Sequence, residues 1–130
     1  MVGDTVGDFI IQLKNAGMVG KKEVRLPYSK LKHAIANVLQ KEGYVSEVSS
    51  DGEAAKKQLA VSLQYDNGTH TINGVKRISK PGRRLYTKAA DIYPVKFGKG
   101  RVILSTPAGI LTGEEARQKN VGGEQLFMIW

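Results

Sequence analysis

The chain has 130 residues, of which 41% are apolar, and a formal net charge of +8 at pH 7. This length fits one domain or two small lobes, and the apolar fraction excludes wholesale disorder. No apolar run approaches the ~18 residues of a membrane-spanning helix, and the opening "MVGDTVGDFI" lacks the basic start of a secretory signal. Because the chain contains no cysteine, thiol catalysis, disulfides and Cys-based zinc sites are excluded.

The first 65 residues predict an N-terminal lobe with the order α-β-α-β-β. A helix is expected to begin at Asp4 or Thr5 and to stop at Gly17, with apolar residues at helical spacing between them. "KEVRLPY" alternates as a short strand that ends at Pro27. Ser29 then caps a second helix that closes at Gly43. "YVSEVSS" and "KQLAVSLQY" predict two strands joined by a turn at "DGE".

Residues 66–130 predict a mainly β C-terminal lobe with one short helix, and the turn "DNG" marks the expected boundary. "HTINGVKRIS", "RRLYTKA" and "GRVILSTP" predict strands separated by Gly/Pro loops. In "TGEEARQK", Thr112 and Glu115 have the spacing of a capping box at the start of a helix. "EQLFMIW" predicts a last strand. The sequence therefore predicts an α+β protein of two small lobes, residues 1–65 and 66–130.

Basic residues are concentrated in the second lobe. Residues 1–65 carry nine Lys/Arg and seven Asp/Glu, whereas residues 66–130 carry eleven and five. Nine of the basic residues lie between Lys76 and Arg101, with Asp91 as the one acid. This asymmetry favours an anionic partner facing the second lobe. The alternative is that the basic surface only keeps the protein soluble. A membrane partner is less favoured, because the sequence contains no basic amphipathic helix with an aromatic face.

Catalytic and nucleotide-binding interpretations find little support. The two histidines, His33 and His70, belong to no metal-ligand pattern, and His33 is expected to be solvated. Glu114 and Glu115 are simply explained as acids in the first turn of a helix. "FGKGRV" lacks the further residues of a dinucleotide loop or a P-loop. The sequence therefore predicts no enzyme, no metal site and no cofactor.

Two segments favour a nucleic-acid site. "SKPGRRLY" places Arg83 and Arg84 beside a Pro-Gly turn and before Tyr86, so that phosphates and a stacked base could be held together. "STPAG" offers small hydroxyl residues on a lean loop that a folded RNA can approach closely. In the alternative interpretation, Tyr86 belongs to the core and residues 105–112 form a strand-to-helix turn in which Thr112 only caps.

Five stretches in order resemble the bacterial ribosomal protein S-eight family of the small subunit. They are "DFIIQLKNA", "PYSKLKHAIANVLQKEGY", "SKPGRRLY", "STPAGILTGEEAR" and a "GGE" close to the C-terminus. The resemblance implies a two-lobed α/β protein that binds an irregular helix in the central domain of small-subunit rRNA. It implies a primary rRNA binder that supports assembly in the cytoplasmic ribosome, beside neighbouring small-subunit proteins and without catalysis. In some members the protein also represses its own operon by binding mRNA, which is the alternative main role here.

Carried over by position, the resemblance implies a set of RNA-binding residues. In the C-terminal lobe they are Ser105, Thr106, Gly109, Thr112, Arg84, Tyr86 and Glu124. A second contact in the N-terminal lobe would use Lys14, Asn15, Ser29 and Lys30. Glu124 would orient a neighbouring donor or accept a hydrogen bond from RNA, although a solvated acid is the alternative.

The chain departs from the family pattern at the loop. The family usually reads Ser-Thr-Ser followed by a long polar or basic residue, and here those last two positions are Pro107 and Ala108. The missing hydroxyl is expected to weaken RNA binding, because one hydrogen bond contributes about 1 kcal/mol.

Overall fold

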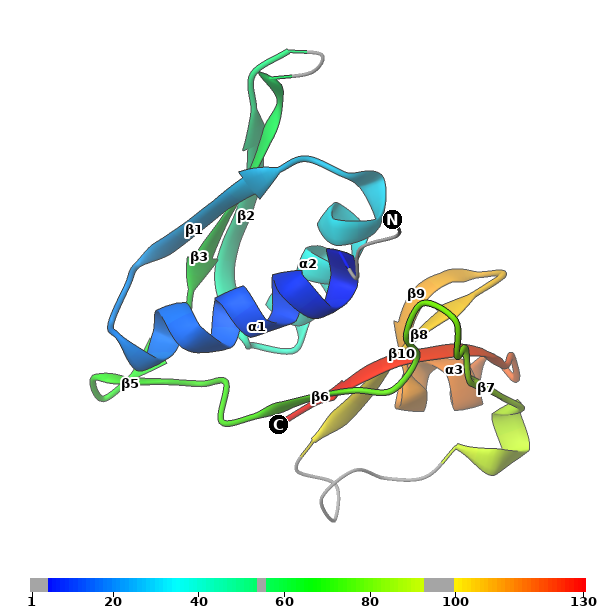
Figure 1. Ribbon diagram of the computed structural model, residues 1–130. Coiled ribbons are helices and arrows are strands. Elements are labelled where there is room, and N and C mark those ends of the chain that lie inside the picture. The colour runs from blue at the N-terminus through cyan, green and yellow to red at the C-terminus, as the bar shows by residue number, and fades with distance from the viewer. Residues whose placement is uncertain (1–4, 54–55, 93–99) are drawn as a thin grey trace. The chain divides into compact units, whose positions relative to one another are not determined.

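The computed structural model describes residues 5–53, 56–92 and 100–130, which fall into two compact units. One unit is Phe9–Ile72, and the other is Asn73–Trp130 together with the N-terminal residues to Asp8 (Figure 1). Helices and sheets occur together, which confirms the α+β class. The "DNG" turn forms a hairpin within the first unit, with Asn67 and Gly68 at positive φ. The lobe boundary at residues 65 and 66 stays a prediction.

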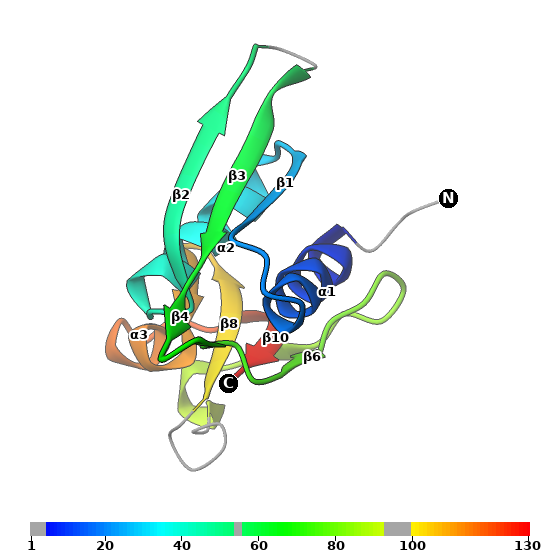
Figure 2. The ribbon, with the colours of Figure 1, turned by 90° about the vertical axis from the view of Figure 1, so that its left-hand side faces the viewer.

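The unit Phe9–Ile72 is built on a three-stranded antiparallel sheet with the order β1-β3-β2 (Figure 2). The central strand, β3, is buried along most of its length. A two-stranded hairpin, β4-β5, follows it. The unit contains α1 Thr5–Met18 from Phe9 onward. The other elements are β1 Glu23–Pro27, α2 Lys30–Lys41, β2 Val45–Asp51, β3 Gln58–Leu63, β4 Tyr65–Asp66 and β5 Thr69–His70.

Both ends of α2 follow the prediction. The side chain of Ser29 accepts a hydrogen bond of 3.1 Å from the backbone N–H of Lys32, as an N-cap does. At the other end, Gly43 has a φ of +85°, and the Tyr44 N–H donates to the carbonyl of Leu39. This is the glycine-ended helix terminus expected at that position.

The predicted end of α1 at Gly17 is one residue too early. The helix continues to Met18, and Gly20 takes the left-handed conformation that ends it. Gly17 serves a different purpose, because a Cβ there would lie 2.3 Å from Nδ1 of His70. The glycine therefore makes room for the half-buried imidazole of β5 rather than ending the helix.

The second unit contains an antiparallel sheet with the order β6-β10-β8-β9, and β7 also pairs with β10. Helix α3 packs on β8 and β9 above a small apolar core of Ile92, Val102, Leu104, Leu111 and Ala116. The elements are β6 Val75–Arg77, β7 Tyr86–Thr87, η2 Ala89–Asp91, β8 Arg101–Thr106, β9 Gly109–Thr112, α3 Gly113–Gln118 and β10 Gly123–Ile129.

The strand predictions in this unit need correction. "HTINGVKRIS" does not form one strand, because His70 belongs to β5 and only Val75–Arg77 joins the large sheet. Between them, the N–H groups of Asn73 and Gly74 both donate to the Trp130 carbonyl, which interrupts regular pairing. "RRLYTKA" contributes only Tyr86–Thr87, and β9 was not predicted at all.

Candidate nucleic-acid interface

Strand β10 brings three of the predicted site residues into one row. Glu124 lies opposite Tyr86 of β7 on one side and opposite Ser105 of β8 on the other. Residues directly opposite each other in antiparallel strands carry their side chains on the same face. Tyr86 is 69% exposed, so it does not belong to the core. The row Tyr86–Glu124–Ser105 therefore presents an aromatic ring, a carboxylate and a hydroxyl together.

Two glycines allow the three strands to come this close. A Cβ on Gly122 would lie 2.3 Å from the carbonyl oxygen of Thr87, and one on Gly123 would lie 2.1 Å from that of Ser105. No side chain fits at such distances from a backbone oxygen. The "GG" of the sequence is thus a structural requirement of the row, and the pairing of β10 with β8 shifts register between Gln125 and Phe127, just beyond it.

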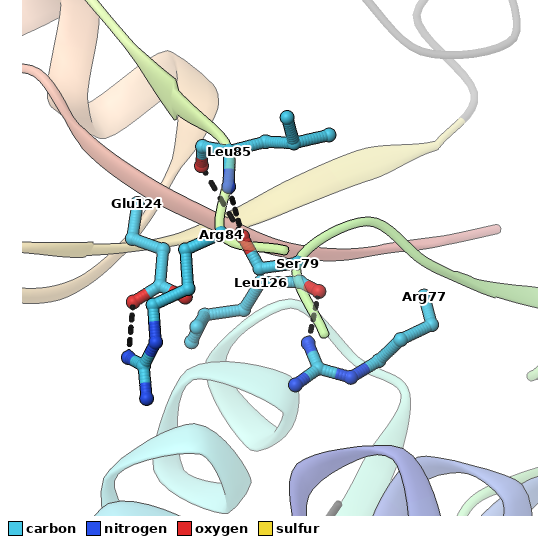
Figure 3. A network of polar contacts seen from close by, with 6 residues as sticks. All are labelled: Arg77, Ser79, Arg84, Leu85, Glu124 and Leu126. Atoms are coloured by element: carbon cyan, nitrogen blue, oxygen red, sulfur yellow. Dashed lines mark hydrogen bonds and ion pairs between the residues drawn. The ribbon is translucent and has the colours of Figure 1, made fainter. Parts of the chain in front are cut away.

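Arg84 reaches this row through an ion pair. Its Nη1 donates to Oε1 of Glu124 at 3.3 Å (Figure 3). The Arg84 side chain is 61% exposed, whereas that of Glu124 is only 14% exposed. The carboxylate is therefore not a solvated acid. It accepts a hydrogen bond from the Arg84 guanidinium, which agrees with the hypothesis that Glu124 orients a neighbouring donor.

The turn that carries Arg83 and Arg84 is held by hydrogen bonds to the buried Ser79, a residue that the sequence analysis did not predict. The Ser79 hydroxyl accepts from the Leu85 N–H at 2.9 Å and is within 3.2 Å of the Leu85 carbonyl, to which it donates (Figure 3). Between Ser79 and Leu85, Lys80 and Arg83 exchange two backbone hydrogen bonds, and Gly82 has a φ of +84°. A Pro followed by a Gly at positive φ is the signature of a type II turn.

The predicted loop 105–112 is a β-hairpin between β8 and β9 with Pro107 and Ala108 at its turn. The Thr106 hydroxyl closes this turn, donating to the Gly109 carbonyl at 2.8 Å and accepting from the Ala108 N–H at 3.1 Å. Residues 107–109 are exposed, and Ser105 and Thr106 are half-buried. The tip is thus lean, exposed and internally braced.

Thr112 has a structural role in this structure. Its side chain is fully buried and accepts from the Glu115 N–H, while Glu115 bonds back to the Thr112 N–H. This is the capping box that the sequence predicted. A hydroxyl so enclosed is not accessible to RNA in the free protein, which favours the alternative in which Thr112 only caps.

The described cations between Lys76 and Arg101 divide into two groups by exposure. Five of the nine between Lys76 and Arg101 are exposed, namely Lys76, Lys80, Arg83, Arg84 and Lys88. Arg77 and Arg101 are half-buried and donate to the backbone carbonyls of Leu126 and Gly100. Lys96 and Lys99 lie outside the described residues. Lys80, Arg83 and Arg84 thus flank the Pro-Gly turn, and Lys88 directly follows β7, which carries Tyr86.

The four predicted N-terminal contacts lie in the other unit. Lys14 is half-buried and Asn15 is exposed on α1, whereas Ser29 and Lys30 form the start of α2. Beside them, Lys57 lies 4.1 Å from the ring centroid of Tyr28.

His33, expected to be solvated, is half-buried instead. Its Nδ1 lies 3.2 Å from the Tyr28 hydroxyl, and the two rings meet edge to face. The sequence signal for this contact is the five-residue spacing of Tyr28 and His33 across the start of α2.

Within residues 5–53, 56–92 and 100–130, no three His, Cys, Asp or Glu side chains gather as metal ligands. None of the helices described there is long and apolar enough to cross a membrane.

Comparisons of the sequence with family models and with known proteins all give the same family. The family model described as "Ribosomal protein S8" matches residues 4–130. A "Small ribosomal subunit protein uS8" from Ruthia magnifica is 44% identical over 99% of this chain and 98% of its own length. Proteins with the same description from Nitratidesulfovibrio vulgaris and Dictyoglomus thermophilum are 42% and 43% identical, covering 100% and 98% of their lengths.

Proposed function

Since the chain belongs to the ribosomal protein S8 family, a family of structural and non-catalytic ribosomal proteins, we propose that it binds small-subunit rRNA directly. Its proposed target is an irregular helix in the central domain. There it acts early in assembly as a primary binder and holds the RNA in shape. Its setting is the cytoplasmic ribosome, where neighbouring small-subunit proteins are further partners.

The observation that carries this proposal is the row Tyr86–Glu124–Ser105 with Arg84 bonded to its middle member. An exposed ring can stack on a base, a hydroxyl can bond to a base edge or a 2′-OH, and a guanidinium can hold a phosphate. A duplex without irregularities offers no unstacked base and has a major groove too narrow for side chains. The row therefore suits an irregular helix better than a regular one.

Affinity and selectivity come from different residues in this proposal. Arg84 and the exposed cations around the Pro-Gly turn contact phosphates, which gives affinity without sequence information. Ser105, Tyr86 and the exposed tip at Gly109 approach the bases and riboses. A second contact at Lys14, Asn15, Ser29 and Lys30 adds affinity through the other unit.

The proposed contact set differs from the carried-over one at two threonines and at Glu124. Thr112 is left out because its hydroxyl is buried and caps α3. Thr106 becomes a positioning residue, because its hydroxyl already makes both hydrogen bonds that close the hairpin. Glu124 likewise positions the Arg84 guanidinium, while its own exposure is small.

The experiment that tests the proposal is RNA binding by Arg84→Ala over a range of salt concentrations. Loss of one phosphate contact should weaken binding to every RNA and reduce the slope of log K against log salt by about 1. Gln118→Ala, an exposed and uncharged change on α3, is the control. An unchanged slope would remove Arg84 from the interface. Co-sedimentation with small subunits at high salt then distinguishes a ribosomal component from a free mRNA repressor, which would wash off.

A further inference from the structure

The three-stranded sheet of the unit Phe9–Ile72 has one face that the helices of this unit leave uncovered. Both α1 and α2 lie on the opposite face (Figures 1 and 2). The burial of β1 follows this division, because exposed and buried residues alternate along the strand. The uncovered side, named the outer face from here on, has no role in the proposal above.

The register of the strands gives the composition of the outer face. The exposed residues of β1 lie opposite alternate residues of the central strand β3, and these lie opposite alternate residues of β2. The middle strand contributes mostly small residues, so the charged side chains come from the two outer strands. The resulting rows are Glu23–Ser62–Glu47, Arg25–Ala60–Ser49 and Pro27–Gln58–Asp51.

The outer face is acidic in a chain whose total charge is +8. Its rows contain three carboxylates and one guanidinium, which gives a net charge of −2. Glu53 and Lys56, which follow in the turn between β2 and β3, cancel each other. Such a surface repels phosphates and attracts cations. It therefore fits a basic polypeptide rather than RNA.

The one cation of the outer face is already engaged. Arg25 donates from Nε to Glu23 at 2.7 Å and from Nη1 to Asp51 at 2.9 Å. The bond to Asp51, followed by that to Glu23, raises the pKa of Arg25. Glu47 is exposed and has no ion pair among the described residues, and the Asp51 side chain is still 59% exposed. Both carboxylates of β2 can therefore accept further bonds.

Strand β2 is also an edge of the sheet. The order β1-β3-β2 leaves its second edge unpaired within the described residues (Figure 2). At the beginning of the strand, the Gln40 side chain donates to the Ser46 carbonyl at 3.1 Å. From Glu47 to Asp51 the residues are exposed, apart from the half-buried Val48. An extended peptide can add to such an edge through main-chain hydrogen bonds.

From these features we infer that an extended, basic segment of a neighbouring small-subunit protein adds to the edge of β2 at residues 47–51. Alternate side chains of an added strand lie on the outer face. Lysine or arginine at two positions four residues apart therefore lies beside Glu47 and Asp51, and the residue midway between them lies beside Ser49. This inference rests on the proposed place of the protein in the ribosome, and it assigns a surface and a chemistry to a protein partner.

Crosslinking from the middle of the edge tests the inference. Because the chain has no cysteine, Ser49→Cys carries the one thiol to which a photoactivatable group can be attached. The variant is assembled into small subunits, and the crosslinked peptides are identified by mass spectrometry. The tether at residue 49 should label one segment of one neighbouring protein, with basic residues at the stated spacing. The matched control, Asn37→Cys at an exposed position of α2, should not label that segment.

Charge reversal gives the second measurement. Glu47→Lys, added to the Ser49→Cys protein, should lower the crosslinking yield about three- to tenfold, because an attractive pair becomes a repulsive one. Glu53→Lys makes the same change of charge in the turn beyond β2 and should leave the yield unchanged. The two variants should bind purified rRNA with equal affinity, and thermal melting by circular dichroism verifies that each one folds.

Several results would overturn the inference. They are labelling of rRNA, of a second copy of this chain, or of a segment without basic residues, and a yield that Glu47→Lys leaves unchanged. Absence of any crosslink in assembled subunits would overturn it too, since the charges would then only protect the edge from aggregation. The RNA interface has a separate outcome. Normal RNA binding by Arg84→Ala would remove that interface, whatever the tether at residue 49 labels.

Discussion

The carboxylate of Glu124 lies 3.3 Å from Nη1 of Arg84, and the carboxylate is largely buried while the guanidinium is largely exposed. The backbone of Glu124 is held between two strands, opposite Tyr86 and Ser105. An acid in a basic surface is thereby explained without any direct contact to RNA, because it fixes where the exposed cation lies.

If Glu124 acts through Arg84, the two residues should show a coupled effect on RNA binding. We expect Glu124→Gln to weaken binding about three- to tenfold, the effect of one net hydrogen bond. In the Arg84→Ala background the same change should have little further effect. A double-mutant cycle measured by filter binding tests this expectation, and additive losses would mean that Glu124 contacts the RNA independently.

The two glycines before Glu124 should be intolerant of any side chain. Gly123→Ala places a Cβ 2.1 Å from a backbone oxygen of β8, so the strands must separate and burial is lost. We expect a loss of more than about 2 kcal/mol in the free energy of unfolding, measured in urea. Gly20→Ala is the matched control, since its φ is positive but the space around it is open, and its cost should be about 1 kcal/mol. Equal losses would contradict the steric argument.

Ser79 should be important for stability although it contacts no RNA in the proposal. Ser79→Ala leaves the N–H and carbonyl of Leu85 without their side-chain partner, which should cost about 1–3 kcal/mol. RNA affinity should fall as well, because the turn that carries Arg83 and Arg84 loosens. Ser50→Ala, at an exposed position of β2, should leave both quantities unchanged. Full stability of the Ser79 variant would show that the two hydrogen bonds between Ser79 and Leu85 are dispensable.

Substitutions at Thr112 and at Ser105 should affect different properties, the stability of the fold and the affinity for RNA respectively. Thr112→Ala removes the capping box and should cost about 1 kcal/mol of stability, with nearly unchanged RNA affinity at a temperature where the protein is folded. Ser105→Ala should do the opposite, with an affinity loss of severalfold. Melting curves and binding isotherms on the same samples give both quantities. The opposite pattern would return Thr112 to the contact set.

The departure at Pro107 predicts a gain of function. Pro107→Ser introduces the hydroxyl that the S8 family usually has at this position, which is exposed in the turn. We expect RNA affinity to rise about fivefold, as one additional hydrogen bond allows. Ala108→Ser, its neighbour in the turn, is the control and should have a smaller effect. No gain at position 107 would mean that the hairpin tip does not touch RNA at that point.

The local features of the fold could be predicted because their signals are local. Ser29, Gly43 and the pair Thr112 and Glu115 each mark a helix end within a few residues, and the structure contains each cap. Strand β9 was missed because four residues next to a helix start give too short an alternation. Gly17 was misread as a helix end because its partner, His70, lies 53 residues along the chain.

The site could be predicted as a list of residues but not as an arrangement. Residues 86, 105 and 124 meet only through the pairing of β7, β8 and β10, and the register of these strands depends on two glycines and a bulge. Ser79 was missed since a single serine gives no signal of burial. The ion pair of Arg84 with Glu124 likewise joins positions 40 residues apart.

The central claim is that the row Tyr86–Glu124–Ser105 selects a folded RNA rather than any polyanion. The most direct measurement is the ratio of dissociation constants for the irregular central-domain helix of small-subunit rRNA and for a regular duplex of equal length, at one salt concentration. The account predicts a preference for the irregular helix of at least about 100-fold, most of which is lost in a variant combining Ser105→Ala and Tyr86→Ala. Equal affinity for both RNAs, or a preference that survives in this variant, would contradict it.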